Sequence, residues 1–153
     1  MESVNQRRIY VASSWRNAYQ PDVVNALRGA CHEVYDFRKP ALGNTGFRWS
    51  EIDPAWQSWS PAEFRDALTH PIARHGFGLD FEAMQWADAG VLLLPSGRSA
   101  HLEAGYFVGA RKPLHILLPP EPMEAELMYL MATSMSRSIA ELVRRLHPAG
   151  EPS

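Results

Sequence analysis

The chain has 153 residues, of which 46% are hydrophobic, and this length fits one compact domain with a substantial core rather than two small ones. The formal net charge of −2 gives no basic field for wrapping DNA or RNA, so a nucleic-acid polymer is excluded as the expected partner. A small nucleotide needs only a local cluster of hydrogen-bond donors, so this class of ligand stays open.

Cysteine usage and hydropathy indicate the compartment. Cys31 is the only cysteine, which excludes an intramolecular disulfide and a zinc site built from cysteines. The amino-terminal MESVNQRRIYVASS lacks the apolar run of a signal peptide, and no window approaches a membrane span. We therefore expect a cytoplasmic protein that makes no contact with a membrane. We also expect no metal and no cofactor. The sequence spacing between histidines and carboxylates does not match that of a metal-binding site at any of these five positions: His32, His70, His75, His115 and His147.

The first elements form a βαβ unit. Residues 8–12 are rich in β-formers and end at Ser13-Ser14, and a helix with an apolar face follows Pro21. Residues 32–37 (HEVYDF) then predict a second strand.

Residues 38–78 interrupt this alternation and form a Trp-rich insertion within a single domain, 1–153. Ser60, Pro61 and Glu63 predict the capped start of a helix that runs to about Leu68 and stops before Pro71. The insertion's three tryptophans have two interpretations, stacking on a nucleobase or forming a small core, and the second is slightly favoured: Trp49, Trp56 and Trp59.

The second half resumes the alternation. A helix at 79–87 leads into a strand of consecutive apolar residues at 91–94, and a helix to about 110 precedes the strand 114–118. A helix at 122–131, a short edge strand at 131–135 and an amphipathic helix at 136–146 complete the pattern, before a frayed tail. The predicted fold class is α/β: a doubly wound, flavodoxin-like five-stranded parallel sheet with helices on both faces.

The segment AGVLLLPSGRSAHLEAGY, residues 89–106, has the layout of a nucleotide-handling site. A buried strand ends at Pro95, and a polar loop opens a helix whose free amides favour anions. Glu103 follows on the first turns of that helix, above the carboxyl ends of the strands, where open α/β sheets bind ligands. The loop's candidate ligand-binding residues are Ser96, Gly97, Arg98 and Ser99.

Three segments, in this order, resemble the nucleoside 2-deoxyribosyltransferase family, which includes 2'-deoxynucleoside 5'-phosphate N-hydrolases and CMP hydrolases. They are IYVASSW at 9–15, LDFEAMQWAD at 79–88 and HLEAGY at 101–106. The resemblance implies that Glu103 attacks C1' of the sugar, that Tyr10 takes part in catalysis, and that Tyr10 and Trp15 contact the base and the sugar. It also implies that Asp80 contacts the departing base, although Asp80 as a helix N-cap is an equal alternative. Finally, it implies a homodimer or larger homo-oligomer in which a neighbour completes the pocket.

A glutamate suits this chemistry, because cleavage of an N-glycosidic bond develops positive charge on the sugar that a carboxylate stabilises and then traps. In family members that act on free nucleosides, an aspartate six residues before the nucleophile receives the sugar 5'-hydroxyl, and here Gly97 stands in its place. Arg98 and the neighbouring hydroxyls favour a phosphate instead. Residues of the first loop would complete the pocket: Ser13, Ser14 and Arg16.

The resulting prediction is an enzyme that cleaves the N-glycosidic bond of a nucleoside or its 5'-monophosphate and passes the sugar to water or another base. Two alternatives remain, a TIR-like NAD glycohydrolase and a non-catalytic nucleotide sensor, because fold alone does not decide function. A helix face with Met123, Met128 and Met131 would pack on the core or on a partner subunit. His101 would touch phosphate, cap the helix or face solvent.

Overall fold

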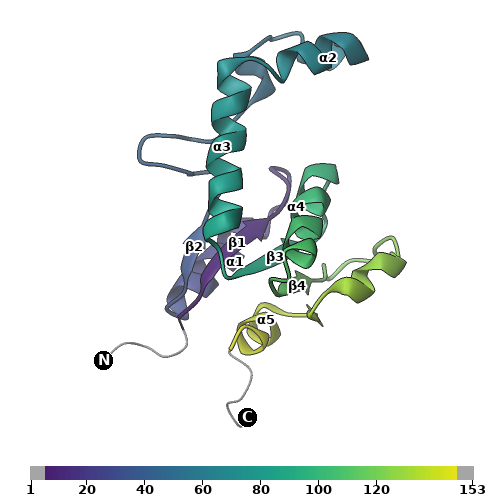
Figure 1. Ribbon diagram of the computed structural model, residues 1–153. Helices are drawn as coiled ribbons and strands as arrows, with labels where there is room; N and C mark the ends of the chain where they lie inside the picture. Colours follow the sequence, from purple (N-terminus) through teal and green to yellow (C-terminus); the bar gives the residue numbers. More distant parts are fainter. Residues whose placement is uncertain (1–5, 148–153) are drawn as a thin grey trace. The chain divides into compact units, whose positions relative to one another are not determined.

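The computed structural model describes residues 6–147, in which one sheet of five parallel strands carries the fold (Figure 1). The strands are β1 (Arg8–Ala12), β2 (Glu33–Tyr35), β3 (Ala89–Leu93), β4 (Leu114–Leu117) and β5 (Ser134–Ser136), in the spatial order β2-β1-β3-β4-β5. This order is that of flavodoxin-like sheets, so the predicted fold class is confirmed.

The described helices are α1 (Gln20–Gly29), α2 (Pro61–Ala67), α3 (Pro71–Trp86), α4 (Arg98–Gly109) and α5 (Ile139–Arg145). Short 3-10 helices lie at η1 (Trp49–Glu51), η2 (Trp56–Ser58) and η3 (Leu127–Met131). Between residues 6 and 147, no helix is long and apolar enough to span a bilayer.

Helices pack on both faces of the sheet because side chains alternate along each strand. Ile9 and Val11 of β1 join one apolar core with Val91 and Leu93 of β3 and with side chains of α1 and α5. Tyr10, between Ile9 and Val11, lies on the opposite face, where its ring is near Phe107 of α4 with 5.8 Å between ring centroids. The sheet is therefore covered by α1 and α5 on one face and by α4 on the other.

The chain divides into two compact units, Met1–Tyr35 with Trp86–Ser153, and Asp36–Gln85. The first unit contains the whole sheet, and the second contains the predicted Trp-rich insertion together with α2 and most of α3. Within the second unit, the capping box of Ser60 and Glu63 is formed, which confirms the predicted start of α2. The interpretation of the chain as a single domain stays a prediction.

The tryptophans of the second unit have different environments. Trp49 packs edge-on against Trp59 and Phe64, with ring centroids 5.7 and 5.8 Å away. The indole nitrogen of Trp59 donates to a carboxylate oxygen of Asp53 at 2.7 Å. Trp56 remains exposed. Trp49 and Trp59 therefore belong to the small core that holds this unit together.

Two predicted helices differ from the structure. Helix α3 begins at Pro71 rather than at 79, because proline is tolerated in the first helical turn, so Asp80 lies inside the helix and is not its N-cap. Residues 122–126 are not helical, and only η3 forms at 127–131, because the apolar side chains of this segment stay exposed and no tertiary packing stabilises an α-helix there. All three methionines of this segment are exposed, which contradicts packing on the core, while the alternative of packing on a partner subunit stays a prediction: Met123, Met128 and Met131.

Candidate functional site

The candidate site lies in the first unit at the carboxyl ends of β1 and β3. The connection after β1 leads to β2 on one side and the connection after β3 leads to β4 on the other, so the strand order reverses between β1 and β3. Open α/β sheets bind ligands at such a switch point. The two loops that flank it, 13–19 and 94–97, contain most of the residues that the sequence predicted for ligand binding.

Helix α4 lies close to the sheet because Gly90, the strand residue beneath it, has no side chain. Gly90 of β3 pairs with Tyr10 of β1, and a Cβ atom built on Gly90 would be 2.7 Å from ring atoms of Phe107. The Phe107 ring therefore fills the space above Gly90 and beside Tyr10. Since Glu103 precedes Phe107 by about one helical turn, this packing also fixes the height of Glu103 above the sheet.

Glu103 and His101 lie on opposite flanks of α4. The buried stripe of the helix consists of Ala100, Ala104 and Phe107, and a step of about 100° per residue puts His101 on one flank and Glu103 on the other. The His101 flank faces η3, since Nε2 of His101 is 2.8 Å from the hydroxyl of Tyr129. Since η3 follows β4, the His101 flank lies on the β4 side of the helix. β1 is on the other side of β3, so the opposite flank, with the half-buried Glu103, faces β1 and the switch point.

Tyr10, the third residue predicted to be catalytic, is only 1% exposed. Its ring stacks on Tyr35 with 5.4 Å between centroids and an interplanar angle of 11°. Tyr10 thus has a packing role on the α4 face of the sheet, and its catalytic role stays a prediction.

The β1–α1 loop folds around its own polar groups. The Ser13 hydroxyl donates to the Ser14 carbonyl at 3.2 Å, and the Ser14 hydroxyl accepts from the Arg16 backbone amide at 3.1 Å. Trp15 and Arg16 are exposed at the tip. The loop therefore presents an aromatic ring and a guanidinium to solvent at the end of β1.

The β3–α4 loop ends at Gly97, the N-cap of α4. A Cβ atom built on Gly97 has no neighbour within 4 Å, so the surface above this residue is open. Arg98 and Ser99 are exposed in the first helical turn, whose backbone amides have no acceptor inside the helix. The open helix start with an adjacent guanidinium can hold an anion.

Asn17 joins the two loops of the candidate site, a role that the sequence analysis did not identify. Its side-chain nitrogen donates to the carbonyls of Leu93, at 3.4 Å, and Pro95, at 3.0 Å, and thus crosses from one loop to the other. Its side-chain oxygen accepts from the Tyr19 amide at 2.8 Å. The partners on the second loop are almost eighty residues away in sequence, so no local pattern signals this role.

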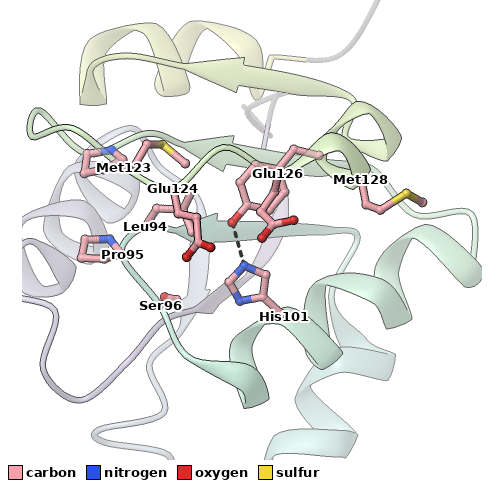
Figure 2. Close-up of a pocket in the computed structure, with 10 residues that line it drawn as sticks. Leu94, Pro95, Ser96, His101, Met123, Glu124, Glu126 and Met128 are labelled. Atoms are coloured by element: carbon pink, nitrogen blue, oxygen red, sulfur yellow. Dashed lines mark hydrogen bonds between the residues drawn. The ribbon is translucent and has the colours of Figure 1, made fainter.

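A pocket of about 340 Å³ lies on the other flank of α4, beneath residues 119–129. Ser96 lines it from the β3–α4 loop, and Figure 2 shows the carboxylates of Glu124 and Glu126 on the side that faces His101. Burial, and then these two carboxylates, raise the pKa of Tyr129. Of the residues predicted to contact a ligand, Ser96 and His101 line this pocket, whose two carboxylates disfavour an anionic ligand.

Comparisons with known proteins identify the fold. No protein-family model matches the sequence, and no curated protein matches it. A solved 2-deoxyribosyltransferase from Bacillus psychrosaccharolyticus is 18% identical, with a TM-score of 0.58 over 88% of this chain and 89% of its own. The chain has the 2-deoxyribosyltransferase fold.

Two further solved structures are similar. A conserved protein from Enterococcus faecalis is 13% identical with a TM-score of 0.57, over 94% of this chain and 98% of its own. A CMP N-glycosidase from Clostridium botulinum is 15% identical with a TM-score of 0.49, over 91% of this chain and 97% of its own.

Within the 2-deoxyribosyltransferase fold of this chain, the predicted residues fall into two groups. Glu103, Tyr10 and both loops belong to the first compact unit, whereas Asp80 lies in α3 in the second. The pairing of Asp80 with Glu103 therefore stays a prediction. In the part of the chain from residue 6 to 147, no three His, Cys, Asp or Glu side chains gather as they would around a metal ion.

Proposed function

We propose that the protein cleaves the N-glycosidic bond of a nucleoside 5'-monophosphate, with Glu103 as the nucleophile and water or a second base as the acceptor of the sugar. The observation that carries the proposal is the position of Glu103 on the flank of α4 that faces the switch point of a 2-deoxyribosyltransferase fold. A carboxylate in that position has access to a ligand bound at the carboxyl ends of β1 and β3.

The reaction proceeds in two displacements. A carboxylate oxygen of Glu103 forms a bond to C1' while the C1'–N bond breaks, and the electron pair of that bond leaves with the base. The base nitrogen takes a proton from Asp80 in its protonated form or from solvent. Water, or the nitrogen of a second base, then attacks C1', loses its proton and releases the Glu103 carboxylate.

The loop composition supports a phosphate at the 5' position. The amides at the start of α4 and the Arg98 guanidinium supply charge-assisted donors, and bidentate bonds of this kind suit phosphate oxygens. No carboxylate occurs at residues 94–99, which form the β3–α4 loop and the start of α4. In this proposal, Arg16 completes the phosphate site from the first loop.

The test is the release of free base from a panel of nucleoside 5'-monophosphates, deoxynucleosides and NAD, with and without an acceptor base, followed by chromatography. We expect release from monophosphates, and Glu103→Gln should lower the rate at least about a thousandfold because the nucleophile is lost. The matched control is Glu33→Gln, which makes the same change on the exposed surface of β2. Intact-mass spectrometry of acid-quenched wild type should detect the sugar bound to Glu103.

Other outcomes replace the proposal with a named alternative. Release from NAD alone, with free nicotinamide as product, identifies a TIR-like glycohydrolase. Tight nucleotide binding without release of base identifies a sensor. Full activity of Glu103→Gln contradicts the role of this carboxylate even if base is released.

A further inference from the structure

Three backbone carbonyls, one at the end of β3 and two in the β3–α4 loop, each accept a hydrogen bond from a side-chain donor. The carbonyl of Leu93 accepts from the Ser96 hydroxyl, that of Pro95 from Asn17 Nδ2 at 3.0 Å, and that of Gly97 contacts His101 Nδ1 at 2.7 Å. Because a carbonyl oxygen only accepts, Nδ1 of His101 is the donor in this last contact. Alternate carbonyls along the loop are therefore engaged by the protein itself.

This arrangement matters for an anion because carbonyl oxygens carry partial negative charge and repel phosphate oxygens. Backbone amides attract an anion only when the neighbouring carbonyls are directed away from it. In this loop, side chains from three different positions engage those carbonyls before any ligand binds. The loop is thus preorganised for an anion at the start of α4.

Among the three donors, Asn17 is the one that belongs to the opposite loop. It is 3% exposed, and its backbone amide donates to the Ser14 carbonyl at 3.0 Å while its side-chain oxygen accepts from Tyr19. One side chain therefore fixes the shape of the β1–α1 loop and the position of the β3–α4 loop. These are the two loops assigned to the phosphate in the proposed function.

We propose that Asn17 is the positioning residue of the phosphate site: it contacts no substrate atom and sets the β3–α4 loop for the 5'-phosphate. This inference rests on the proposed function and names the residue that gives its site specificity for phosphate. A purely structural role would weaken the handling of every substrate equally. A positioning role weakens the 5'-monophosphate selectively and leaves the unphosphorylated nucleoside almost unaffected.

The variant that tests the role is Asn17→Asp, which keeps the size of the side chain and the oxygen that accepts from Tyr19. It replaces the Nδ2 donor with an oxygen that faces the carbonyls of Leu93 and Pro95. Asn17→Ala removes the donor without adding a charge, and serves if the aspartate prevents folding. The matched control is Asn25→Asp on the exposed face of α1.

The measurements are KM and kcat for a nucleoside 5'-monophosphate and for the corresponding nucleoside, with the Kd of the monophosphate from calorimetry. We expect KM and Kd of the monophosphate to rise at least about tenfold in both Asn17 variants, while kcat/KM for the nucleoside changes less than threefold. An equal loss for both substrates in a folded variant overturns the inference. The inference is also overturned if the wild-type Kd of the monophosphate is no lower than that of the nucleoside.

Calorimetry separates this inference from the proposed function. If wild type binds the monophosphate but releases no base, the proposed reaction fails and the Kd values alone decide the role of Asn17. If neither variant folds, an NMR titration of wild type decides instead. The amides of Gly97 to Ala100 and the side-chain amide of Asn17 should then shift together as the nucleotide saturates, and unchanged signals overturn the inference.

Discussion

At the scale of single residues, the proposed function assigns to the β3–α4 loop the choice between a phosphate and a hydroxyl at the 5' position of the sugar. Gly97 has an extended backbone with φ −89° and ψ −164°, and a Cβ atom there meets nothing within 4 Å. A Cβ atom therefore fits at this position without backbone strain. The charge at position 97 can be changed without rebuilding the loop, so substrate selection can be tested directly.

The first prediction is that Gly97→Asp shifts the preference from nucleoside 5'-monophosphates to unphosphorylated nucleosides. A carboxylate at the helix N-cap accepts a bond from a 5'-hydroxyl but repels a phosphate. We expect KM for the monophosphate to rise at least about tenfold, equivalent to about 1.4 kcal/mol, and kcat/KM for the nucleoside to increase. Steady-state kinetics with both substrates check the shift.

The control for this substitution is Gly109→Asp, which adds the same charge at the other end of α4, where a Cβ atom also has no neighbour within 4 Å. We expect its substrate preference to equal that of wild type. If Gly97→Asp retains the wild-type preference as well, the loop does not hold the phosphate.

At the scale of secondary-structure elements, the contact of Gly90 with Phe107 sets α4 on the sheet. The second prediction is that Gly90→Ala destabilises the protein by about 1–3 kcal/mol, because the new methyl group overlaps an aromatic ring rather than a flexible side-chain end. Urea denaturation measures the change. Gly105→Ala in α4 is the control, because its methyl group meets nothing within 4 Å, and it should be neutral or stabilising. Equal stability of Gly90→Ala and wild type would contradict this account of helix packing.

Strand β4 contains a buried histidine, and we expect this residue to make the protein less stable in mild acid. His115 is 3% exposed, and burial, followed by the charges of Arg7 and Arg145, lowers its pKa from 6.5 to about 4. The folded state keeps His115 neutral, while the unfolded chain takes up a proton as the pH falls below about 6.5. The contribution of neutral His115 to the free energy of unfolding is therefore fully present above pH 6.5 and is lost as the pH falls toward 4.

The third prediction is that the free energy of unfolding falls by about 2 kcal/mol between pH 7.5 and 5 because of His115 alone. Burial also lowers the pKa of His32, so the total loss in wild type is larger. Urea denaturation of His115→Asn at both pH values should show a smaller loss than wild type, and the exposed His75→Asn should match wild type. An equal loss in His115→Asn and wild type would assign the pH dependence to other groups.

Sequence patterns predicted those elements that local chemistry determines. The apolar run from Val91 to Leu94 predicted the central strand, and Ser60 with Glu63 predicted the start of α2, because each pattern lies within a few residues. The position of Glu103 one to two turns inside α4 was likewise predicted from its distance to the polar loop.

Features that depend on distant partners were not predictable in this way. The contacts of Asn17 with Leu93 and Pro95 join residues 76 and 78 positions apart, and no periodicity encodes them. The helix predicted at 122–131 did not form because its apolar side chains are exposed and have no tertiary partners that would stabilise a helix. Local patterns determine the elements, and tertiary contacts decide how the loops between them are held.

At the scale of the whole molecule, an apolar surface along η3 is exposed to solvent in a single chain. Leu127 and Leu130 are 76% and 74% exposed, and Met128, Leu130 and Met131 follow one another closely on the same short helix. Exposed apolar side chains that lie together mark interaction surfaces more often than isolated ones do. The resemblance to nucleoside 2-deoxyribosyltransferases predicts a second copy of this chain as the partner.

The last prediction is therefore that the protein is a dimer or larger homo-oligomer whose contact includes η3. Leu127→Lys combined with Leu130→Lys should lower the molar mass to that of one chain, 17.2 kDa, in size-exclusion chromatography with light scattering, because buried lysines without partners are costly. Leu42→Lys is the control, since this leucine is exposed in the other compact unit. If a neighbour completes the site, the monomeric variant also loses turnover while keeping its thermal stability. Wild type that is monomeric at micromolar concentration contradicts the prediction, and the apolar surface of η3 then needs a different partner.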